Sequence, residues 1–216
     1  MINQKLLNTI CNSARIPTIS IADRLIEDHQ LLFKTVNQLR QMGLIIVYTM
    51  GTWDLFHIGH GRYFRKGKEF GDVLIVGIDG DEYIKKHKGA DRPIVPYQER
   101  WETVADQRSV DIATILSTQT ANDELVRLIR PDVVVLSFSS AKEDFGAYEE
   151  RMRQKYEPYC KEVKILPRQA ETSTSAKIRL VIISGARPLL DLVKKYTGEL
   201  VEAVESFFKK IEGGNV

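Results

Sequence analysis

Five short apolar runs, separated by helix-like stretches, constrain the fold of this chain more than any other feature. Each run is dominated by Val, Ile and Leu. Such runs are too short for a buried helix, but they suit strands that are buried on both faces. Strands that alternate with helices form a parallel sheet with helices on both of its faces. The sequence therefore predicts an α/β fold with an open, five-stranded parallel sheet, whose strands lie at residues 44–48, 73–78, 111–116, 132–136 and 162–166.

The chain divides into three parts around this pattern. A helix is expected over residues 20–43, because Ser20 can cap it, apolar residues recur at helical spacing and Gly43 can end it. This helix precedes the first strand and forms an N-terminal extension. The predicted parts are an N-terminal helical extension (1–43), an α/β domain (44–184) and a C-terminal helical tail (185–216).

The C-terminal tail is predicted to be helical but interrupted. Helical patterns cover residues 175–184 and 188–212, and Gly185 and Pro188 are expected to separate them. Apolar residues recur along the second of these patterns. We expect this tail to pack either on the core or on a second subunit.

Composition excludes several classes of function. The chain has 31 Lys and Arg and 29 Asp and Glu, and the net charge of +2 is too small to indicate a nucleic-acid or membrane partner. Cys11 and Cys160 have neither the spacing of a metal site nor that of a disulfide framework. The sequence shows no signal peptide and no apolar stretch of membrane-spanning length. We therefore expect a cytoplasmic protein with free thiols, in which a local site holds any bound anion.

The first candidate site follows the first predicted strand, where the chain reads GTWDLFHIGH over residues 51–60. Gly51 allows an anion to approach the backbone, and the helix that starts here offers unpaired N–H groups. His57 and His60 are three residues apart, which places both imidazoles on one face of the first turn. A zinc site would need a third ligand that the sequence does not place. The segment therefore predicts a cradle for phosphate groups.

The segment GTWDLFHIGH resembles the signature G-x-F/Y-D-x-x-H-x-G-H of the cytidylyltransferase-like nucleotidyltransferases. Residues 44 to about 180 are similar in motif order to glycerol-3-phosphate, phosphocholine and phosphoethanolamine cytidylyltransferases and to the adenylyltransferase half of ADP-heptose synthases. The resemblance implies a Rossmann-like fold in which His57 and His60 are catalytic and stabilise charge on the triphosphate. The alternative is that both histidines only cap the helix or pack against it. The resemblance also implies that the nucleotide and its phosphates are bound by Gly51, Thr52, Trp53, Asp54 and Gly59.

A basic loop, KKHKGADRPIVP over residues 85–96, follows the second predicted strand and leads to a helix that contains Arg100. Taken alone, a loop of this composition is a solvated turn. The family has a Lys-Gly pair at this place, so the resemblance implies that Lys88 is a catalytic contact to phosphate. It also implies that Arg100 supports the active-site loop or binds its ligand. The form KGADRPIVP is similar to the heptose and archaeal FAD synthase branch, which favours ATP.

The segment QRSVD at residues 107–111 favours a different nucleotide. It resembles the RYVDEV motif of cytidylyltransferases, in which an Arg and an Asp precede the third strand. The resemblance implies that Arg108 binds the nucleotide and that the substrate is CTP. Two alternatives remain, since Arg108 can complement a helix dipole and Asp111 can cap the strand entry.

The last motif, LPRQAETSTSAKIR at residues 166–179, places hydroxyl groups where a helix begins. Ser and Thr at such places ordinarily cap the helix. The motif is similar to the LPRT…ISTT motif of glycerol-3-phosphate cytidylyltransferases, which implies that Arg168, Ser173, Thr174 and Ser175 bind the β- and γ-phosphates. The chain departs from the family after Leu136, where a Gly/Asp-rich turn is common, and this departure leaves the recognition of base and acceptor open.

The resemblance implies transfer of a cytidylyl group from CTP to a small phosphorylated polyol, amino alcohol or sugar, with release of pyrophosphate. Transfer of an adenylyl group from ATP is the alternative. Mg²⁺ is expected to bind through the triphosphate without a protein metal ligand, and a homodimer is expected because the family is commonly dimeric. Class I aminoacyl-tRNA synthetases share the HIGH sequence, but this chain has no KMSKS sequence. A non-catalytic nucleotide-binding subunit is the third competing interpretation.

Overall fold

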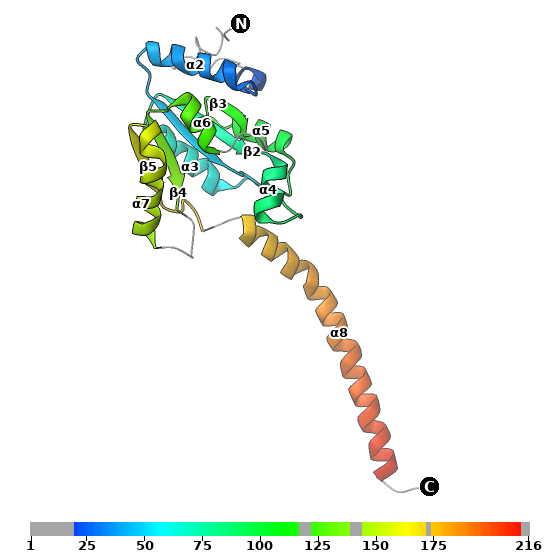
Figure 1. The fold of residues 1–216 in the computed structure, drawn as a ribbon. Helices are drawn as coiled ribbons and strands as arrows, with labels where there is room; N and C mark the ends of the chain where they lie inside the picture. The colour runs from blue at the N-terminus through cyan, green and yellow to red at the C-terminus, as the bar shows by residue number, and fades with distance from the viewer. Residues whose placement is uncertain (1–19, 117–121, 139–143, 172–173, 213–216) are drawn as a thin grey trace. The chain divides into compact units, whose positions relative to one another are not determined.

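The computed structural model describes residues 20–116, 122–138, 144–171 and 174–212. The chain separates into two units, of which the first ends at residue 172 and the second starts at residue 173. The first unit contains the sheet and its helices, and the second contains one long helix (Figure 1). None of the helices in the described ranges combines the length and the apolar character that a membrane span requires.

The predicted five-stranded parallel sheet is confirmed, with the strand order β3-β2-β1-β4-β5. All neighbouring strands pair in parallel. The central strands are buried over most of their length because they carry β-branched side chains towards helices on both faces. The first strand starts two residues later than predicted. The strands are β1 (Ile46–Gly51), β2 (Val73–Asp79), β3 (Ile112–Leu116), β4 (Val133–Ser137) and β5 (Glu162–Leu166).

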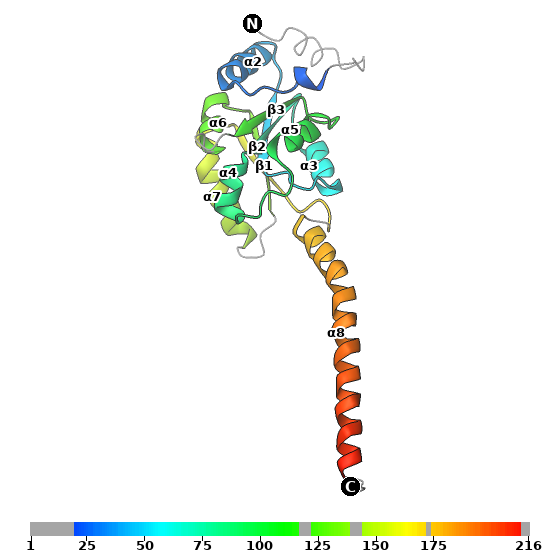
Figure 2. The ribbon, with the colours of Figure 1, turned by 90° about the vertical axis from the view of Figure 1, so that its right-hand side faces the viewer.

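Helices cover both faces of the sheet, as the alternation of elements predicts. One apolar cluster joins the sheet to α2, α6 and α7, and a second cluster joins the opposite face to α3 and α5. The two layers can be followed on either side of the sheet in Figure 2. The helices of this unit are α2 (His29–Gln41), α3 (Ile58–Lys68), α4 (Asp81–Lys88), α5 (Tyr97–Ala105), α6 (Asn122–Ile129) and α7 (Phe145–Tyr156), and the 3₁₀ turns are η1 (Ile21–Asp23) and η2 (Glu157–Tyr159).

The prediction of one helix over residues 20–43 is wrong at its start. After η1 the chain is extended, and α2 begins only after Asp28, whose carboxylate accepts two backbone N–H groups of the first turn at 2.8 and 3.3 Å. Asp28 is therefore the N-cap in place of Ser20. The predicted end is confirmed, because Gly43 follows the helix with a φ of +80°.

The extended segment before α2 lies along β3 at the edge of the sheet. Leu25 forms a parallel bridge with Ala113. The Ala113 N–H donates to the carbonyl oxygen of Arg24 at 2.9 Å, and the Ile26 N–H donates to the carbonyl oxygen of Ala113 at 3.0 Å. Together with the packing of α2 in the first apolar cluster, these bonds make the N-terminal segment part of the sheet unit.

The second unit is a single helix, α8 (Thr174–Glu212), which is 39 residues long. The predicted interruption at Gly185 and Pro188 is wrong, because Pro188 lies inside the continuous helix. Proline removes one backbone hydrogen bond from a helix interior, but the helix continues on both sides of it. Helical propensity and apolar periodicity over the flanking residues outweigh this local loss.

The order of the strands fixes where a ligand can bind. The chain runs from β1 to β2 on one side and returns to place β4 on the other side of β1. The carboxyl end of β1 is therefore a topological switch point, where open α/β sheets bind their ligands. The loop of residues 52–57 leaves the sheet at this point and leads into α3.

Candidate functional site

The loop after β1 has an unusual backbone that a buried indole supports. Trp53 and Leu55 have φ values of 52° and 45°, which residues other than glycine seldom adopt. The Trp53 Nε1–H donates to the carbonyl oxygen of Gly77 at 2.9 Å, and its side chain is only 8% exposed. A Cβ on Gly51 would lie 3.0 Å from this indole, so a glycine there makes room for it. Trp53, predicted to bind the nucleotide, lies under the loop and supports it.

His57 and His60 form a stacked pair at the start of α3. Their ring centroids lie 3.8 Å apart with an interplanar angle of 27°. His57 is the N-cap, and its Nδ1 accepts the Gly59 N–H at 3.1 Å. The proton of the neutral His57 ring is thereby assigned to Nε2. A Cβ on Gly59 would lie 2.9 Å from the His57 ring, so the glycine of the motif makes room for this imidazole.

A chain of hydrogen bonds links α4 to the loop after β1. The Lys88 ammonium donates to the Thr52 hydroxyl at 2.6 Å, and this hydroxyl donates to the buried carboxylate of Asp79 at 2.9 Å. Lys88 was expected in a loop but is the last residue of α4, which places its ammonium at the carboxyl ends of β1 and β2. Asp79, which ends β2, was not identified from the sequence.

Lys88 is exposed as a residue, but the surroundings of its ammonium make it less basic than an ammonium that is fully in water. Burial lowers its pKa below the usual 10.5, and the cations of Arg92 and Arg100 lower this pKa further. The carboxylates of Asp79 and Asp54 act in the opposite direction without restoring the usual value. A bound polyphosphate would favour the charged ammonium, because an opposite charge nearby raises the pKa of a lysine.

Arg100 is buried and holds three segments of the site together. Its side chain is 1% exposed. Its guanidinium donates to the carbonyl oxygens of Thr52, Val95 and Asp79, the latter two at 2.9 and 2.8 Å, and to the Asp81 carboxylate at 2.6 Å. The resemblance implied that Arg100 either supports the active-site loop or binds its ligand. These contacts make it a support of the loop. Its donors are directed at protein acceptors of this site.

Asp54 holds the segment before α5 against the loop after β1. The residue is 2% exposed, and its carboxylate accepts the N–H groups of Ile94 and Val95 at 3.1 and 3.0 Å. It also forms an ion pair with Arg92 at 2.9 Å. Asp54 was predicted to bind nucleotide or phosphate, and the structure gives it these internal contacts. The sequence did not single out Arg92.

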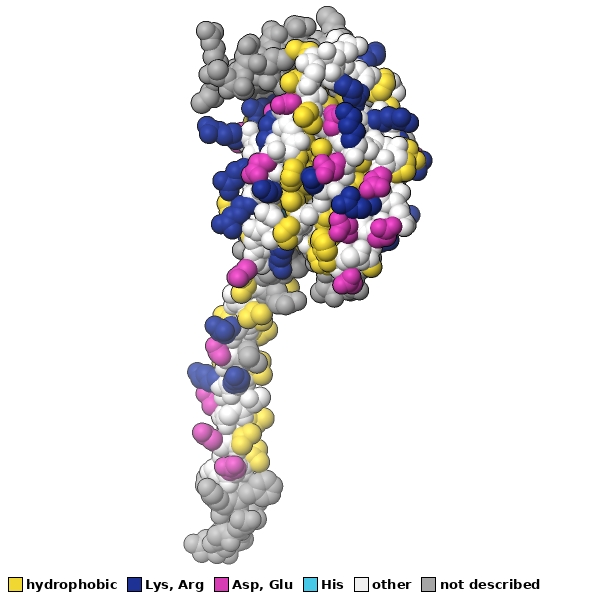
Figure 3. Space-filling model, turned by 90° about the vertical axis from the view of Figure 1, so that its left-hand side faces the viewer, with side chains coloured by type: hydrophobic (Ala, Val, Ile, Leu, Met, Phe, Trp, Pro, Cys, Tyr) yellow, Lys and Arg dark blue, Asp and Glu magenta, His cyan; other side chains and the backbone are white. Residues whose placement is uncertain are grey.

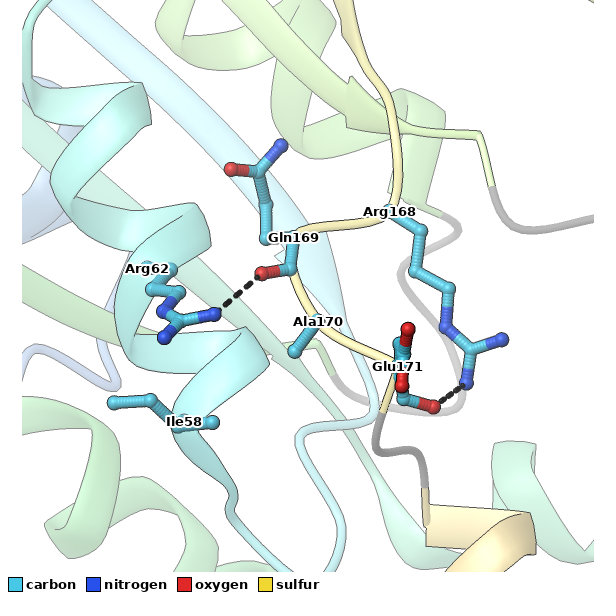
Figure 4. A pocket seen from close by; sticks show the side chains of 6 residues that line it. All are labelled: Ile58, Arg62, Arg168, Gln169, Ala170 and Glu171. Atoms are coloured by element: carbon cyan, nitrogen blue, oxygen red, sulfur yellow. Dashed lines mark hydrogen bonds between the residues drawn. The ribbon is translucent and has the colours of Figure 1, made fainter.

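A hollow of about 710 Å³ lies between the start of α3 and the segment after β5 (Figure 4). The Arg168 guanidinium donates to the carbonyl oxygen of Glu171 at 2.7 Å, and that of Arg62 donates to the carbonyl oxygen of Gln169 at 3.4 Å. A Cβ on Gly59 would lie 3.2 Å from Ala170, so this segment packs closely on the histidine motif. Arg62 was not predicted as a site residue, although it lies only two residues after His60. The lining residues are Ile58, Arg62, Arg168, Gln169, Ala170 and Glu171.

Arg108 and Asp111 lie in the segment before β3. Arg108 is exposed and lies between α5 and β3, where the resemblance to the RYVDEV motif implies it, and the side chain of its neighbour Gln107 would lie 3.9 Å from a Cβ on Gly61 of α3. Asp111 beside it is structural, since its carboxylate accepts the Leu74 N–H at 2.7 Å and pairs with Lys68. Burial raises the pKa of this carboxyl.

The predicted hydroxyl cluster belongs to the second unit or lies outside the described residues. Ser173 is outside them. Thr174 and Ser175 form the first turn of α8, and their side chains are not described. Their predicted phosphate contacts therefore stay a prediction.

Nucleotides and their phosphates bind α/β proteins at a switch-point loop that leads into a helix N-terminus, and two imidazoles and a lysine lie at this place in the protein. The family model described as Cytidylyltransferase-like matches residues 48–179, which is more than half of the chain. The protein therefore belongs to the cytidylyltransferase-like nucleotidyltransferases, and the resemblance found in the sequence is confirmed.

Curated relatives are similar to part of the chain. A protein named "Bifunctional protein HldE" from Nitratiruptor sp. is 38% identical over 113 residues, which are 52% of this chain and 24% of the relative. The protein of the same name from Wolinella succinogenes is 34% identical over 149 residues, which are 68% of this chain and 29% of the relative. The chain thus spans about a quarter of the length of these relatives.

Solved structures that match part of the chain include a "lipopolysaccharide core biosynthesis protein" from Thermoplasma volcanium. It has 23% sequence identity and a TM-score of 0.47, and the match covers 60% of this chain and 100% of that chain. A pantoate-beta-alanine ligase from Francisella tularensis has 13% identity and a TM-score of 0.49, with 70% of this chain and 68% of that chain covered.

Proposed function

We propose that the protein transfers the adenylyl group of ATP to a small phosphorylated sugar and releases pyrophosphate. The observation that carries this proposal is the stacked pair of His57 and His60 at the N-terminus of α3, in a chain that belongs to a nucleotidyltransferase family. Two observations favour ATP over CTP. The curated relatives are HldE proteins, which use ATP as adenylyltransferases. The form KGADRPIVP after β2 is similar to the heptose and archaeal FAD synthase branch.

The chemistry requires positioning and charge stabilisation and no nucleophile from the protein. An oxygen of the acceptor phosphate attacks the α-phosphorus, and the bond from that phosphorus to the bridging oxygen of pyrophosphate breaks. The acceptor phosphate is already ionised at neutral pH, so the obstacle is the repulsion between two anions. The proposed contacts are the Nε2–H of His57, the imidazole of His60, the ammonium of Lys88 and the guanidinium of Arg168. Donors placed around the phosphates stabilise the charge that develops in the transition state.

Mg²⁺ fits this donor set when it is held through the substrate. Within the described ranges, no group of three or more His, Cys, Asp or Glu side chains is placed to hold a metal. The carboxylates nearest the loop, those of Asp54 and Asp79, already accept hydrogen bonds from the protein. Mg²⁺ commonly binds phosphate oxygens and waters with few protein ligands. Bound in this way, it would supply neutralisation of the phosphate charge.

Arg62 adds a second guanidinium to the hollow beside the histidines. Its hydrogen bond to Gln169 is long at 3.4 Å, and the side chain reaches across the hollow from α3 (Figure 4). We expect Arg62→Ala to weaken inhibition by pyrophosphate about tenfold, because a charge-assisted contact is lost. Product-inhibition kinetics measure this effect. Arg65→Ala is the matched control, since Arg65 is exposed in the last turn of the same helix. Equal inhibition constants for the two variants would rule out Arg62 as a phosphate contact.

The lowered pKa of Lys88 predicts an alkaline loss of nucleotide affinity. Only the charged ammonium attracts the triphosphate, so affinity falls as the pH rises through the pKa of Lys88. Because this pKa lies below the usual 10.5, the loss starts at a lower pH than for a surface lysine. We expect the dissociation constant to rise about tenfold along this limb, and Lys88→Arg to remove the limb because arginine stays charged. Titrations of ATP at several pH values test this, with Lys86→Arg as control, and coincident profiles for all three proteins would contradict it.

The proposed reaction is tested by pyrophosphate release from purified protein with Mg²⁺. ATP, CTP, UTP and GTP are each combined with phosphorylated sugars, polyols and amino alcohols. We expect release that depends on both ATP and a sugar phosphate. Acceptor-dependent release with CTP and with none of the other three nucleotides would contradict adenylyl transfer and support cytidylyl transfer. Nucleotide binding without release for any acceptor would instead favour a non-catalytic nucleotide-binding subunit.

A further inference from the structure

The helix α8 carries a regular apolar stripe. Its members follow one another at alternating spacings of four and three residues, and the large side chains among them are 50–65% exposed. Figure 3 shows apolar side chains along one side of this helix and charged side chains along the other. The stripe consists of Ile182, Ala186, Leu189, Val193, Tyr196 and Leu200.

Alternating spacings of four and three give an average period of 3.5 residues, which is the period of a coiled coil. In heptad terms Val193 and Leu200 occupy a positions, and Leu189 and Tyr196 occupy d positions. The flanking positions of the stripe are also apolar, with Leu192 on one side and Ile183 and Val204 on the other. The pattern is therefore that of a helix that packs along its length against another helix.

We propose that α8 pairs with α8 of a second copy of the chain. The stripe lies in the second unit, and the proposal is independent of the reaction at the first unit. Among the described residues outside α8, the large exposed apolar side chains come from separate short segments and do not form a stripe of comparable length. A second α8 carries the matching apolar period. The large exposed apolar side chains outside α8 are Ile21, Met42, Ile45, Ile58, Ile94 and Phe145.

Charge and area support a second copy as the occupant. Helix α8 contains seven basic and five acidic residues, and a net charge of +2 spread over 39 residues gives little attraction to an anionic membrane surface. Eight large apolar side chains lie on or beside the stripe, and each buries on the order of 80 Å² in a helix pair. Two helices then bury on the order of 1,300 Å² in total, which lies within the range of stable interfaces. The eight are Ile182, Ile183, Leu189, Leu192, Val193, Tyr196, Leu200 and Val204.

Sedimentation equilibrium of the full chain tests the pairing. We expect a mass of twice the 24.7 kDa of one chain at micromolar concentration. Leu200→Lys places a charge in the stripe and is expected to raise the dissociation constant of the dimer at least about 100-fold. Glu202→Lys is the matched control, because it adds the same side chain outside the stripe and should leave the dimer intact. Ala186→Leu fills an a position and is expected to lower the dissociation constant.

If Leu200→Lys also loses helix content by circular dichroism, Ala186→Leu still tests the proposal, because it is expected to strengthen the dimer. A monomeric wild-type chain would overturn the proposal, as would equal dissociation constants for Leu200→Lys and Glu202→Lys. Binding of the wild-type chain to phosphatidylserine vesicles, with loss of that binding in Leu200→Lys and no dimer in solution, would overturn it in favour of a membrane surface.

Discussion

The His60→Ala variant should keep its fold and lose roughly 100- to 1,000-fold in kcat for pyrophosphate release. The reason is that His60 stacks on His57 where the helix N-terminus and the two imidazoles face the proposed phosphates. The ring of His60 also lies 5.4 Å from that of Trp53, so a small loss of stability is expected besides the loss of activity. Thermal unfolding and initial rates, measured on the same preparations, separate the two effects.

His87→Ala is the control for this experiment. It removes another imidazole, which is exposed in the last turn of α4 and bonded to the carbonyl oxygen of Tyr83 at 2.7 Å. We expect this variant to turn over at nearly the wild-type rate. Full activity in His60→Ala would show that His60 only packs against its neighbours and takes no part in the reaction.

The neighbouring histidine needs a different substitution because it caps α3. His57→Asn keeps a side-chain acceptor for the Gly59 N–H, whereas His57→Ala removes it and should cost about 1 kcal/mol of stability. If the imidazole acts on phosphate, both variants lose activity although only the alanine variant loses the cap. An active His57→Asn would assign His57 to capping alone.

The second large effect is expected for Arg100→Met, which should destabilise the fold by about 3–5 kcal/mol. The substitution leaves buried carbonyl oxygens of three segments without their donor, and it leaves the Asp81 carboxylate without its cation. Chemical denaturation measures the loss. Arg108→Met, at an exposed position, is the control and should change stability by less than about 0.5 kcal/mol.

The same variant distinguishes the two roles considered for Arg100. As a support, it should lose stability and activity together, and Arg100→Lys should not restore either, since one ammonium cannot replace a planar guanidinium with several donors. A variant with wild-type stability and a raised KM for ATP would show instead that Arg100 binds the ligand.

The sheet could be predicted from the sequence because its strands are short and its central strands are apolar on both faces. Val73–Asp79 is buried throughout, so its composition alone distinguishes it from a helix. The start of α2 could not be predicted in the same way. Apolar spacing continues into residues 20–27, and the choice of Asp28 over Ser20 as the cap depends on the pairing of Leu25 with β3, a contact distant in sequence.

The candidate site was predictable where its residues stand close together in the sequence. His57, Gly59 and His60 belong to one turn, and their geometry follows from helical spacing. Residues that come together from distant segments of the chain were harder to predict. Asp79 and Arg92 become part of the site only through their contacts to Thr52 and Asp54. The role of Arg108 stays a prediction, because a local motif does not show what the side chain of an exposed residue contacts.

The pairing of residues 24–26 with β3 also affects how readily copies of this protein aggregate in a concentrated solution. An uncovered edge strand offers free N–H and C=O groups on which a second chain can nucleate an aggregate. Here the N-terminal segment occupies that edge, and the opposite edge, β5, carries the paired charges of Glu162 and Lys164. Both edge strands, β3 and β5, are thus protected from pairing with a strand of another copy. We expect soluble assemblies of this chain to form through side-chain packing.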